Sequence, residues 1–284
     1  MTVRKAAVAG SWYPGSADAL SAAVDQHVAA AGDAPPAPGR LVALIAPHAG
    51  LIYSGPVAAY SYRLLRDHQF DTVVLVGPSH FVGFEGVSAF CGTGFETPLG
   101  IAAVDRECTE SLIESSSVVR EHPPAHVREH SLEMQLPFVR RLAPQARIVA
   151  LVMGRQTPST AVELGDALAT VLRGRNALLV ASTDLSHYHD ANTAARLDAV
   201  VIDHVARLDA DALQLALDVR PEHACGGGPT VAVLRASRQL GADTSVVLNY
   251  ADSGDVSGDK SAVVGYLAAA IGTSGAPGRA GERR

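Results

Sequence analysis

The sequence predicts a single α/β domain with a mainly parallel central sheet flanked by helices on both faces. Short runs of branched apolar residues, typical of strands buried on both sides, alternate along the chain with stretches that have helical periodicity. No change in composition separates one group of elements from another. We therefore expect one domain over residues 1–271, followed by a small, polar and disordered tail over residues 272–284.

The elements of the first third of the chain have clear boundaries. Ser16 can cap a helix that runs to about residue 31, and the proline-rich stretch 32–39 cannot continue it. A buried strand follows at 41–46. Because proline is accepted in the first turn of a helix, we place the next helix at 56–67. A second buried strand covers 73–76 and is ended by a Gly-Pro pair.

The remaining elements continue this alternation. We expect helices at 105–115 (capped by Asp105), 131–141, 161–172, 191–207, 209–218 and from the glycine turn 226–228 to about 240. We expect strands at 86–90, 147–153, 176–182, 244–250 and 261–270. Strands that alternate with helices in this way are typical of βα units and of a largely parallel sheet.

Composition limits the class of protein. The chain has 284 residues, of which 48% are hydrophobic and 18% charged, so it can bury a sizeable core. Its net charge of -6 provides no basic surface for nucleic acid. We find no signal peptide and no apolar run long enough to span a bilayer. Three cysteines are too few for a disulfide framework, so we expect a cytoplasmic protein.

Polar residues follow three of the predicted strands. The strand at 41–46 leads to His48, the strand at 73–76 to His80, and the strand at 176–182 to Asp184 and His187. A single histidine in such a place usually caps or packs. The carboxyl ends of parallel strands, however, meet at one edge of a sheet, where ligands bind. Several imidazoles brought together there indicate a metal site.

A cysteine adds a further candidate ligand. Cys225 precedes the glycines 226–228 and a predicted helix, a position that can favour the thiolate. The glycines themselves either form an anion-binding nest or allow a tight turn that brings Cys225 to the site.

Other residues are expected around the metal rather than on it. His130 and Glu133 are three residues apart and would share a helix face, from which they could orient metal ligands or contact a substrate. We also place Ser79, Tyr53 and Trp12 in or beside the pocket. Trp12 lies in a predicted turn, where its ring either covers the edge of the core or forms a pocket wall. His122 and His126 are expected to be solvated loop residues.

Several common mechanisms are excluded by missing motifs. The sequence contains no G-x-S-x-G, no P-loop, and no G-x-G-x-x-G after a strand. The stretch that begins at His130 lacks the second histidine of H-E-x-x-H, which excludes a zinc protease of that type.

Six stretches of this chain together resemble one known family. They are AGSWYPG, APHAGLIYSGPVAAY, VGPSH, REHSLEMQLPF, ASTDLSHY and ACGGGP. On these motifs the chain resembles the Memo family, called AmmeMemoRadiSam system protein B in prokaryotes, over about residues 3–271. The resemblance implies a fold like that of the LigB-type class III extradiol dioxygenases, which use non-haem iron. It also implies partners among AmmeCR1-like and radical-SAM proteins.

The resemblance also implies roles for individual residues. In Memo-like proteins two histidines and a cysteine bind the metal, and these correspond here to His48, His80 and Cys225. Asp184 and His187 line the same pocket, and His187 falls where the dioxygenases have an acid/base histidine. Those enzymes complete two histidines with a carboxylate, so either Cys225 or Asp184 is the third ligand here. A thiolate suits copper as well, so the implied cofactor is iron(II) or copper(I), with zinc as a third possibility.

Three functions follow as hypotheses. The first is a metal-dependent redox enzyme, resembling a dioxygenase, that acts on an unidentified small molecule. In it His187 is the general acid/base and Asp184 orients it or serves as an extra ligand. The second is a metal-binding or partner-binding protein without turnover, such as a scaffold or copper-handling component. The third is a hydrolase that uses a metal-bound water.

Overall fold

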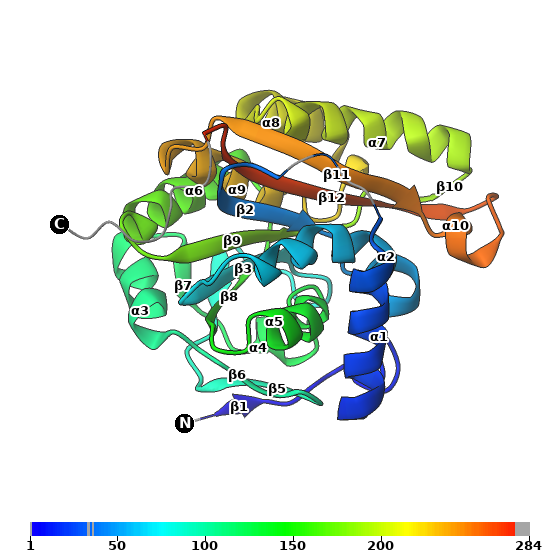
Figure 1. Ribbon diagram of the computed structural model, residues 1–284. Coiled ribbons are helices and arrows are strands. Elements are labelled where there is room, and N and C mark those ends of the chain that lie inside the picture. Colours follow the sequence, from blue (N-terminus) through cyan, green and yellow to red (C-terminus); the bar gives the residue numbers. More distant parts are fainter. Residues whose placement is uncertain (1, 33–34, 36, 276–284) are drawn as a thin grey trace.

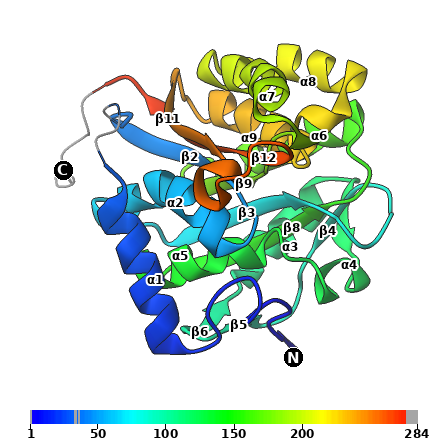
Figure 2. The ribbon, with the colours of Figure 1, turned by 90° about the vertical axis from the view of Figure 1, so that its right-hand side faces the viewer.

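The computed structural model describes residues 2–32, 35 and 37–275. Its main feature is a nine-stranded mixed sheet, with helices packed against both faces (Figures 1 and 2). The expected α/β domain with helices on both sides is therefore confirmed. Within this sheet the parallel part is narrower than expected. It comprises four adjacent central strands, which in spatial order are β2 (Arg40–Ala46), β9 (Ala177–Ser182), β3 (Thr72–Pro78) and β8 (Arg147–Met153).

Antiparallel strands extend the parallel centre on both sides. On one side β12 (Val263–Thr273) pairs with β2, and both β11 (Thr244–Asp252) and β10 (His187–His189) pair with β12. On the other side β4 (Val87–Ala89) pairs antiparallel with β8, and β7 (Val119–Glu121) pairs parallel with β4. A separate small sheet contains β1 (Val3–Arg4), β5 (Gly94–Thr97) and β6 (Gly100–Ala103). The sheet is mixed because β4, β10 and β12 run antiparallel to the strands with which they pair.

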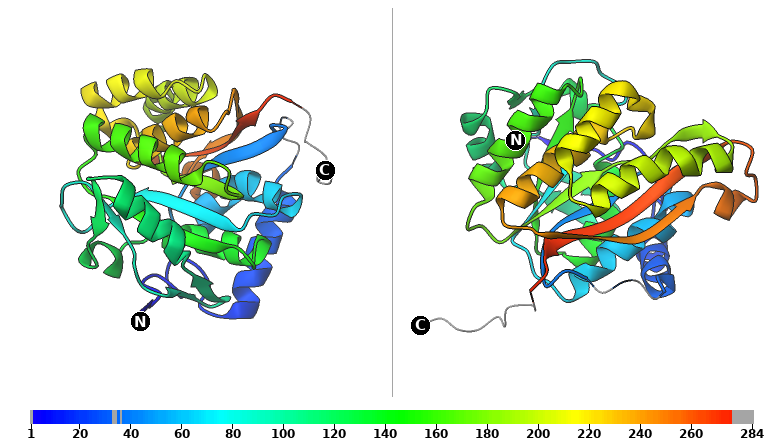
Figure 3. Two further views of the ribbon diagram at one scale, coloured as in Figure 1. Left: turned by 90° about the vertical axis from the view of Figure 1, so that its left-hand side faces the viewer. Right: turned by 90° about the horizontal axis from the view of Figure 1, so that it is seen from above.

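The central strands are buried on both sides because their apolar side chains alternate between two cores. In β3, Val74 and Val76 join one hydrophobic cluster, whereas Val73 and Leu75 join the other. The first core contains side chains of α3 (Arg106–Ser115), α6 (Pro158–Leu172), α7 (Ala191–Ala206), α8 (Ala210–Val219) and α9 (Gly227–Gln239). The second contains side chains of α1 (Ala17–Ala30), α2 (Leu51–Tyr62) and α5 (Leu136–Leu142). Figure 3 shows both helical layers from two further directions.

Three helix predictions were wrong at their starts, and the smallest error is at α6, which begins at Pro158 and not at residue 161. We expected a helix at 56–67, but α2 begins at Leu51 and contains Pro56 in its interior. A tertiary contact fixes the earlier start, because the N–H of Leu51 donates to the carbonyl of Trp12. The helix expected at 131–141 begins as the 3₁₀ turn η2 (Glu133–Gln135) and continues as α5. His130 therefore precedes the helix, and it does not share a helix face with Glu133.

The end of the domain lies slightly beyond the expected boundary. β12 continues to Thr273, where Gly272 pairs with Leu41 and Thr273 with Arg40. The first two residues of the expected tail thus belong to the sheet, and residues 276–284 lie outside the described part of the chain. Short helices complete the fold: η1 (Arg63–Arg66), α4 (Pro124–Val127), η3 (Pro221–His223) and α10 (Gly254–Ser257). Among the described residues we find no helix with the length and apolarity needed to cross a membrane.

Candidate metal centre

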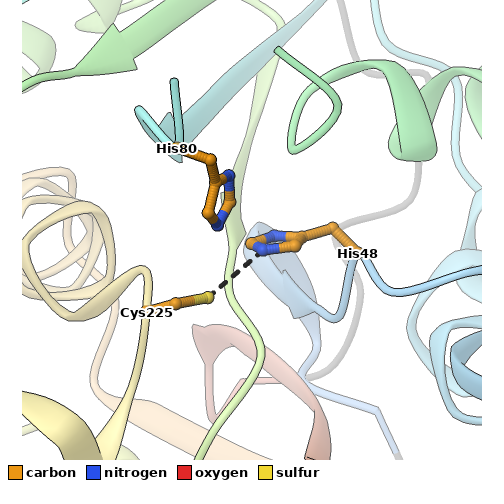
Figure 4. A group of neighbouring side chains, drawn as sticks. All are labelled: His48, His80 and Cys225. Carbon is orange, nitrogen blue, oxygen red and sulfur yellow. Dashed lines mark hydrogen bonds between the residues drawn. The ribbon is translucent and has the colours of Figure 1, made fainter. Parts of the chain in front are cut away.

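The carboxyl ends of three adjacent parallel strands form the floor of the candidate site. His48 follows β2, Asp184 follows β9, and His80 follows β3, in the order in which these strands lie side by side. Cys225 comes from the turn before α9 and meets them from the side (Figure 4). The sheet topology therefore brings together residues that lie up to 177 positions apart in the sequence.

His48, His80 and Cys225 lie close enough to hold one cation. One potential ligand atom from each lies within 4.8 Å of the others. Nε2 of His48 is 3.2 Å from Sγ of Cys225, and the rings of His48 and His80 are 5.2 Å apart, nearly perpendicular. His48 is only 1% exposed, whereas the His80 side chain is 27% exposed. Solvent or a small molecule therefore reaches the group from the side of His80.

Glu129 orients His80 and was missed from the sequence. Its Oε1 accepts a hydrogen bond from Nδ1 of His80 at 2.8 Å, and its Oε2 accepts from the His80 backbone N–H at 2.6 Å. Burial alone would raise the pKa of Glu129. The bonds from His80 and from the Ser131 N–H outweigh it and hold the pKa at about 2. A carboxylate accepts only, so Nδ1 carries the proton and Nε2 is left free to bind a metal.

Asp184 holds the backbone around the site rather than joining the cluster of ligand atoms. Its Oδ1 accepts from the His48 N–H at 2.7 Å, and its carbonyl accepts from the Cys225 N–H at 3.2 Å. Burial raises the pKa of Asp184 to about 6, against the hydrogen bond from His48, which lowers it. Two groups of described residues lie close enough to hold a metal, His48 with His80 and Cys225, and His80 with Glu129 and His130, and Asp184 belongs to neither. The geometry thus favours the thiol as the third ligand.

The ring of His130 packs against the rings of the candidate ligands His48 and His80 and makes no hydrogen bond among the described residues. Its ring lies 4.4 Å from that of His80 and 4.3 Å from that of Trp12, between centroids. Its Nδ1 is buried and has no partner among the described residues, and Oε1 of Glu129 is 3.7 Å away. Burial, followed by the charges of His48 and His80, lowers the pKa of His130 to about 3. The ring is therefore a neutral wall of the site.

The structure places Glu133 elsewhere than in the pocket. Its carboxylate is fully buried and forms an ion pair with Arg4. It also accepts from the N–H groups of Ala7 and Val8 and from the hydroxyl of Tyr13. The expectation that Glu133 contacts a substrate or orients a metal ligand is wrong, because the N-terminal segment occupies both oxygens. Glu133 instead secures the segment that carries Trp12 over His130.

The other predicted site residues are partly or largely exposed. Nδ1 of His187 donates to the carbonyl of Leu185 at 2.8 Å, which leaves Nε2 free. Ser79 is tied to its own loop, because its hydroxyl donates to the carbonyl of Val82. Trp12 and Tyr53 are 38% and 40% exposed, so Trp12 is a wall of the site and not a buried plug.

His126 contradicts the expectation of a solvated loop. It is 2% exposed, and its Nε2 lies 2.9 Å from the Ser88 hydroxyl. Burial, followed by the charge of Arg4, lowers its pKa to about 4. The two prolines that suggested a loop instead begin the short helix α4, which directs the ring inward.

The glycine turn is used for close packing and not for binding an anion. The N–H of Gly226 donates to the Thr183 hydroxyl, and the N–H of Gly228 donates to Oε1 of Gln156. A Cβ at position 226 would lie 2.4 Å from the Ser182 carbonyl oxygen. Of the two interpretations of these glycines, the tight turn that brings Cys225 to the site therefore agrees with the structure.

Known proteins resemble this chain over nearly all of its length. A family model described as Memo-like protein matches residues 4–270. A MEMO1 family protein of Methanothermobacter thermautotrophicus is 38% identical over 272 residues, which cover 93% of this chain and 98% of the relative. Another from Ignicoccus hospitalis is 39% identical, with coverage of 94% and 98%.

A solved structure also resembles this protein. It is that of an uncharacterized protein of Escherichia coli K12, with a TM-score of 0.56 and 17% sequence identity. The match covers 80% of this chain and 99% of the other. At this identity the likeness concerns the fold alone.

Proposed function

The chain belongs to the Memo family, and on that basis we propose that it is a metal-dependent redox protein that uses iron or copper. His48, His80 and Cys225 would hold the metal. The observation that carries this proposal is the convergence of their ligand atoms within 4.8 Å at the carboxyl edge of the sheet.

The donor set fits a transition metal. Two imidazoles and one thiolate suit copper(I), iron(II) or zinc, and are poor ligands for magnesium or calcium. Both His48 and His80 use Nδ1 for a hydrogen bond to the protein. Nε2 of His48 lies beside Sγ of Cys225, and Nε2 of His80 is free to bind a metal. Three protein ligands on an accessible site leave a position for a small molecule, as in catalytic metal sites.

The protein supplies proton transfer and orientation around this centre. When bound, iron or copper supplies the electron-transfer chemistry. His187 has a free Nε2 and is the candidate to move a proton to or from a substrate. Asp184 keeps the His48 backbone in place through its hydrogen bond. The neutral ring of His130 packs against the rings of His48 and His80, and Trp12 packs against His130, so the two rings limit the access of water.

A second candidate function is metal binding without turnover, as in a copper-handling protein. The soft Sγ of Cys225, which lies beside the nearly inaccessible His48, favours a copper-handling function, since Cu(I) prefers soft ligands. Oxygen uptake that depends on the bound metal and on a small reducing substrate such as a catechol would favour the redox enzyme. Tight Cu(I) binding without oxygen uptake would favour the alternative. AmmeCR1-like and radical-SAM proteins are the partners that we propose to test for either function.

The proposal is tested by the metal content of the His80→Ala variant. We expect the protein purified from cells to contain iron or copper and the variant to lose most of it, because one of three ligands is gone. His68→Ala is a matched control. His68 is also partly buried, but it lines a pocket with Arg40 and Asn176 at the opposite edge of the sheet. Equal metal content in the wild type and in His80→Ala, measured by mass spectrometry, would contradict the proposal.

Metal affinity should increase with pH. In the metal-free protein burial, followed by the charge of Asp184, raises the pKa of the Cys225 thiol well above its usual range. Burial, followed by the charge of His80, holds the pKa of His48 well below its usual range. Near neutral pH the thiol is thus protonated and His48 is neutral, so binding through the thiolate releases one proton.

One released proton corresponds to an increase in apparent affinity of about tenfold per pH unit. Competition with a chelator of known affinity, repeated over a pH series, measures this slope. The Cys225→Ser variant is the control and should show a flatter dependence. A wild-type affinity that does not change with pH would show that the thiolate does not bind the metal.

A further inference from the structure

A buried chain of polar side chains leads from the core to His48. The Tyr62 hydroxyl donates to Oε1 of Gln135 at 2.8 Å, and Nε2 of Gln135 donates to the Ser182 hydroxyl at 2.7 Å. The Ser182 oxygen lies 2.9 Å from Nδ1 of His48. Tyr62, Gln135 and Ser182 are inaccessible to solvent, and His48 nearly so. Each donor and acceptor in the chain must therefore find its partner within the protein.

Two backbone carbonyls fix the direction of these hydrogen bonds. The Ser182 hydroxyl donates its single hydrogen to the carbonyl of Ser131 at 2.7 Å. Nε2 of Gln135 also donates to the carbonyl of Pro47 at 3.0 Å, which fixes the orientation of the amide. Because a carbonyl only accepts, Ser182 has no second hydrogen to offer. It must accept from both Gln135 and His48.

From these contacts we infer that Ser182 is a positioning residue that holds His48 in the tautomer with the proton on Nδ1. This inference deepens the proposed metal function and rests on it. In that tautomer the lone pair of Nε2 faces Sγ of Cys225, 3.2 Å away. In the other tautomer an N–H would point at the metal position, and Nδ1 would face a hydroxyl that has no hydrogen left to donate. The protein thus prepares His48 as a ligand before a metal arrives.

One segment prepares both histidines. Residues 129–135 contribute the Glu129 carboxylate that binds His80, and also the Ser131 carbonyl and the Gln135 amide that determine the role of Ser182. The two histidine rings approach from different strands, yet their protonation patterns are determined by this single connection. A change in Ser182 should therefore affect His48 and leave His80 as it is.

The experiment reads the tautomer in the metal-free protein. Two-dimensional NMR of protein with ¹⁵N-labelled histidine, recorded at about pH 8, distinguishes protonated from unprotonated ring nitrogens. The signal that disappears in the His48→Gln variant is that of His48. We expect wild-type His48 to be protonated on Nδ1 only. Ser182→Ala should give a mixture of tautomers at His48 and an unchanged His80. A wild-type proton on Nε2, or a wild-type pattern in Ser182→Ala, would overturn the inference.

A matched control separates this effect from the loss of a buried hydroxyl. Ser61 is also fully buried, and its hydroxyl donates to the carbonyl of Ile45 on the strand that leads to His48. Ser61→Ala should leave the His48 signals unchanged, and a tautomer change there as large as in Ser182→Ala would count against a specific role of Ser182. If Ser182→Ala does not fold, Ser182→Cys keeps nearly the same volume with weaker hydrogen bonds. It should show the same mixture, and a pure wild-type tautomer in it would also overturn the inference.

Metal affinity provides the second measurement. Loss of such an orienting partner typically weakens binding about 10- to 100-fold, and we expect a decrease of that size in Ser182→Ala but not in Ser61→Ala. Unchanged affinity in Ser182→Ala would contradict the positioning role. A wild-type protein that binds no iron, copper or zinc would contradict the proposed function instead, because the tautomer is read without metal.

Discussion

Replacement of Cys225 by serine should weaken Cu(I) binding more than about 100-fold, since loss of a ligand should exceed the loss of an orienting partner. Sγ of Cys225 is the only soft donor among the three candidate ligands, and Cu(I) prefers soft donors. Serine has nearly the same shape but remains a neutral alcohol near pH 7. Iron(II) and zinc depend less on the sulfur, so their affinity should decrease by a smaller factor.

Competition against chelators of Cu(I) and of Fe²⁺, under anaerobic conditions, measures both effects in one series. Cys91→Ser is the matched control, because Cys91 is also a free and partly buried cysteine but is not part of the ligand group. A Cu(I) affinity equal to that of the wild type would show that the thiol does not bind. The buried carboxyl of Asp184 would then be the next candidate for the third ligand.

The sizes of the decreases in Cu(I) affinity and in iron affinity also bear on the function. If Cu(I) binding is lost and iron binding nearly kept, oxygen uptake by the iron-loaded variant shows whether the thiolate contributes to turnover or only to metal choice. Continued uptake would separate catalysis from copper binding. Loss of uptake with iron still bound would assign Cys225 a part in the chemistry itself.

The strand ends of the site could be predicted from the sequence because their signal is local. A short apolar run, a turn and a histidine lie within about ten residues of one another. Because parallel strands end at one edge of a sheet, this local pattern also predicts that the histidines lie close together in space. His48, His80 and Asp184 were found in this way, and the structure brings them to the same edge. Cys225 was predictable from its position before a glycine turn.

The partners of these residues could not be predicted because their contacts are long-range. Ser182 is the last residue of an apolar strand and looks like part of it, although its hydroxyl connects three separate segments. Glu129 stands in a loop beside His130, where a charged residue is usually solvated. The start of α2 was misplaced for the same reason, since a carbonyl 39 positions earlier, that of Trp12, accepts from Leu51.

The ion pair between Arg4 and Glu133 is the clearest contact of this kind, and its loss should destabilise the protein strongly. Both side chains are almost completely buried, with 4% and 0% exposure, and they are 129 positions apart. Arg4→Met removes the positive partner and leaves a buried carboxylate without its counter-charge. Removal of one partner of a buried pair costs about 3–5 kcal/mol, so we expect a loss of that size in the free energy of unfolding.

Urea denaturation measures this loss, and two further variants show its origin. Lys5→Met is the control, because Lys5 pairs with Glu96 at the surface, with 82% of its side chain exposed. Such surface pairs contribute at most about 1 kcal/mol. The double variant Arg4→Met, Glu133→Gln should recover part of the loss. Glutamine is neutral and keeps Oε1, which accepts from both the N–H of Ala7 and the hydroxyl of Tyr13.

The same substitution should reach the metal centre. Arg4 also donates to the carbonyls of His126 and Glu129, so it holds the segment whose carboxylate orients His80. Arg4→Met should therefore weaken metal binding under conditions in which the protein is still folded, by up to about the 10- to 100-fold typical of a lost orienting partner. A variant that is destabilised by several kcal/mol but binds metal with wild-type affinity would show that the N-terminal segment supports only the fold. A decrease in both stability and metal affinity would show that Arg4 also positions the metal site, because it acts on His80 through Glu129.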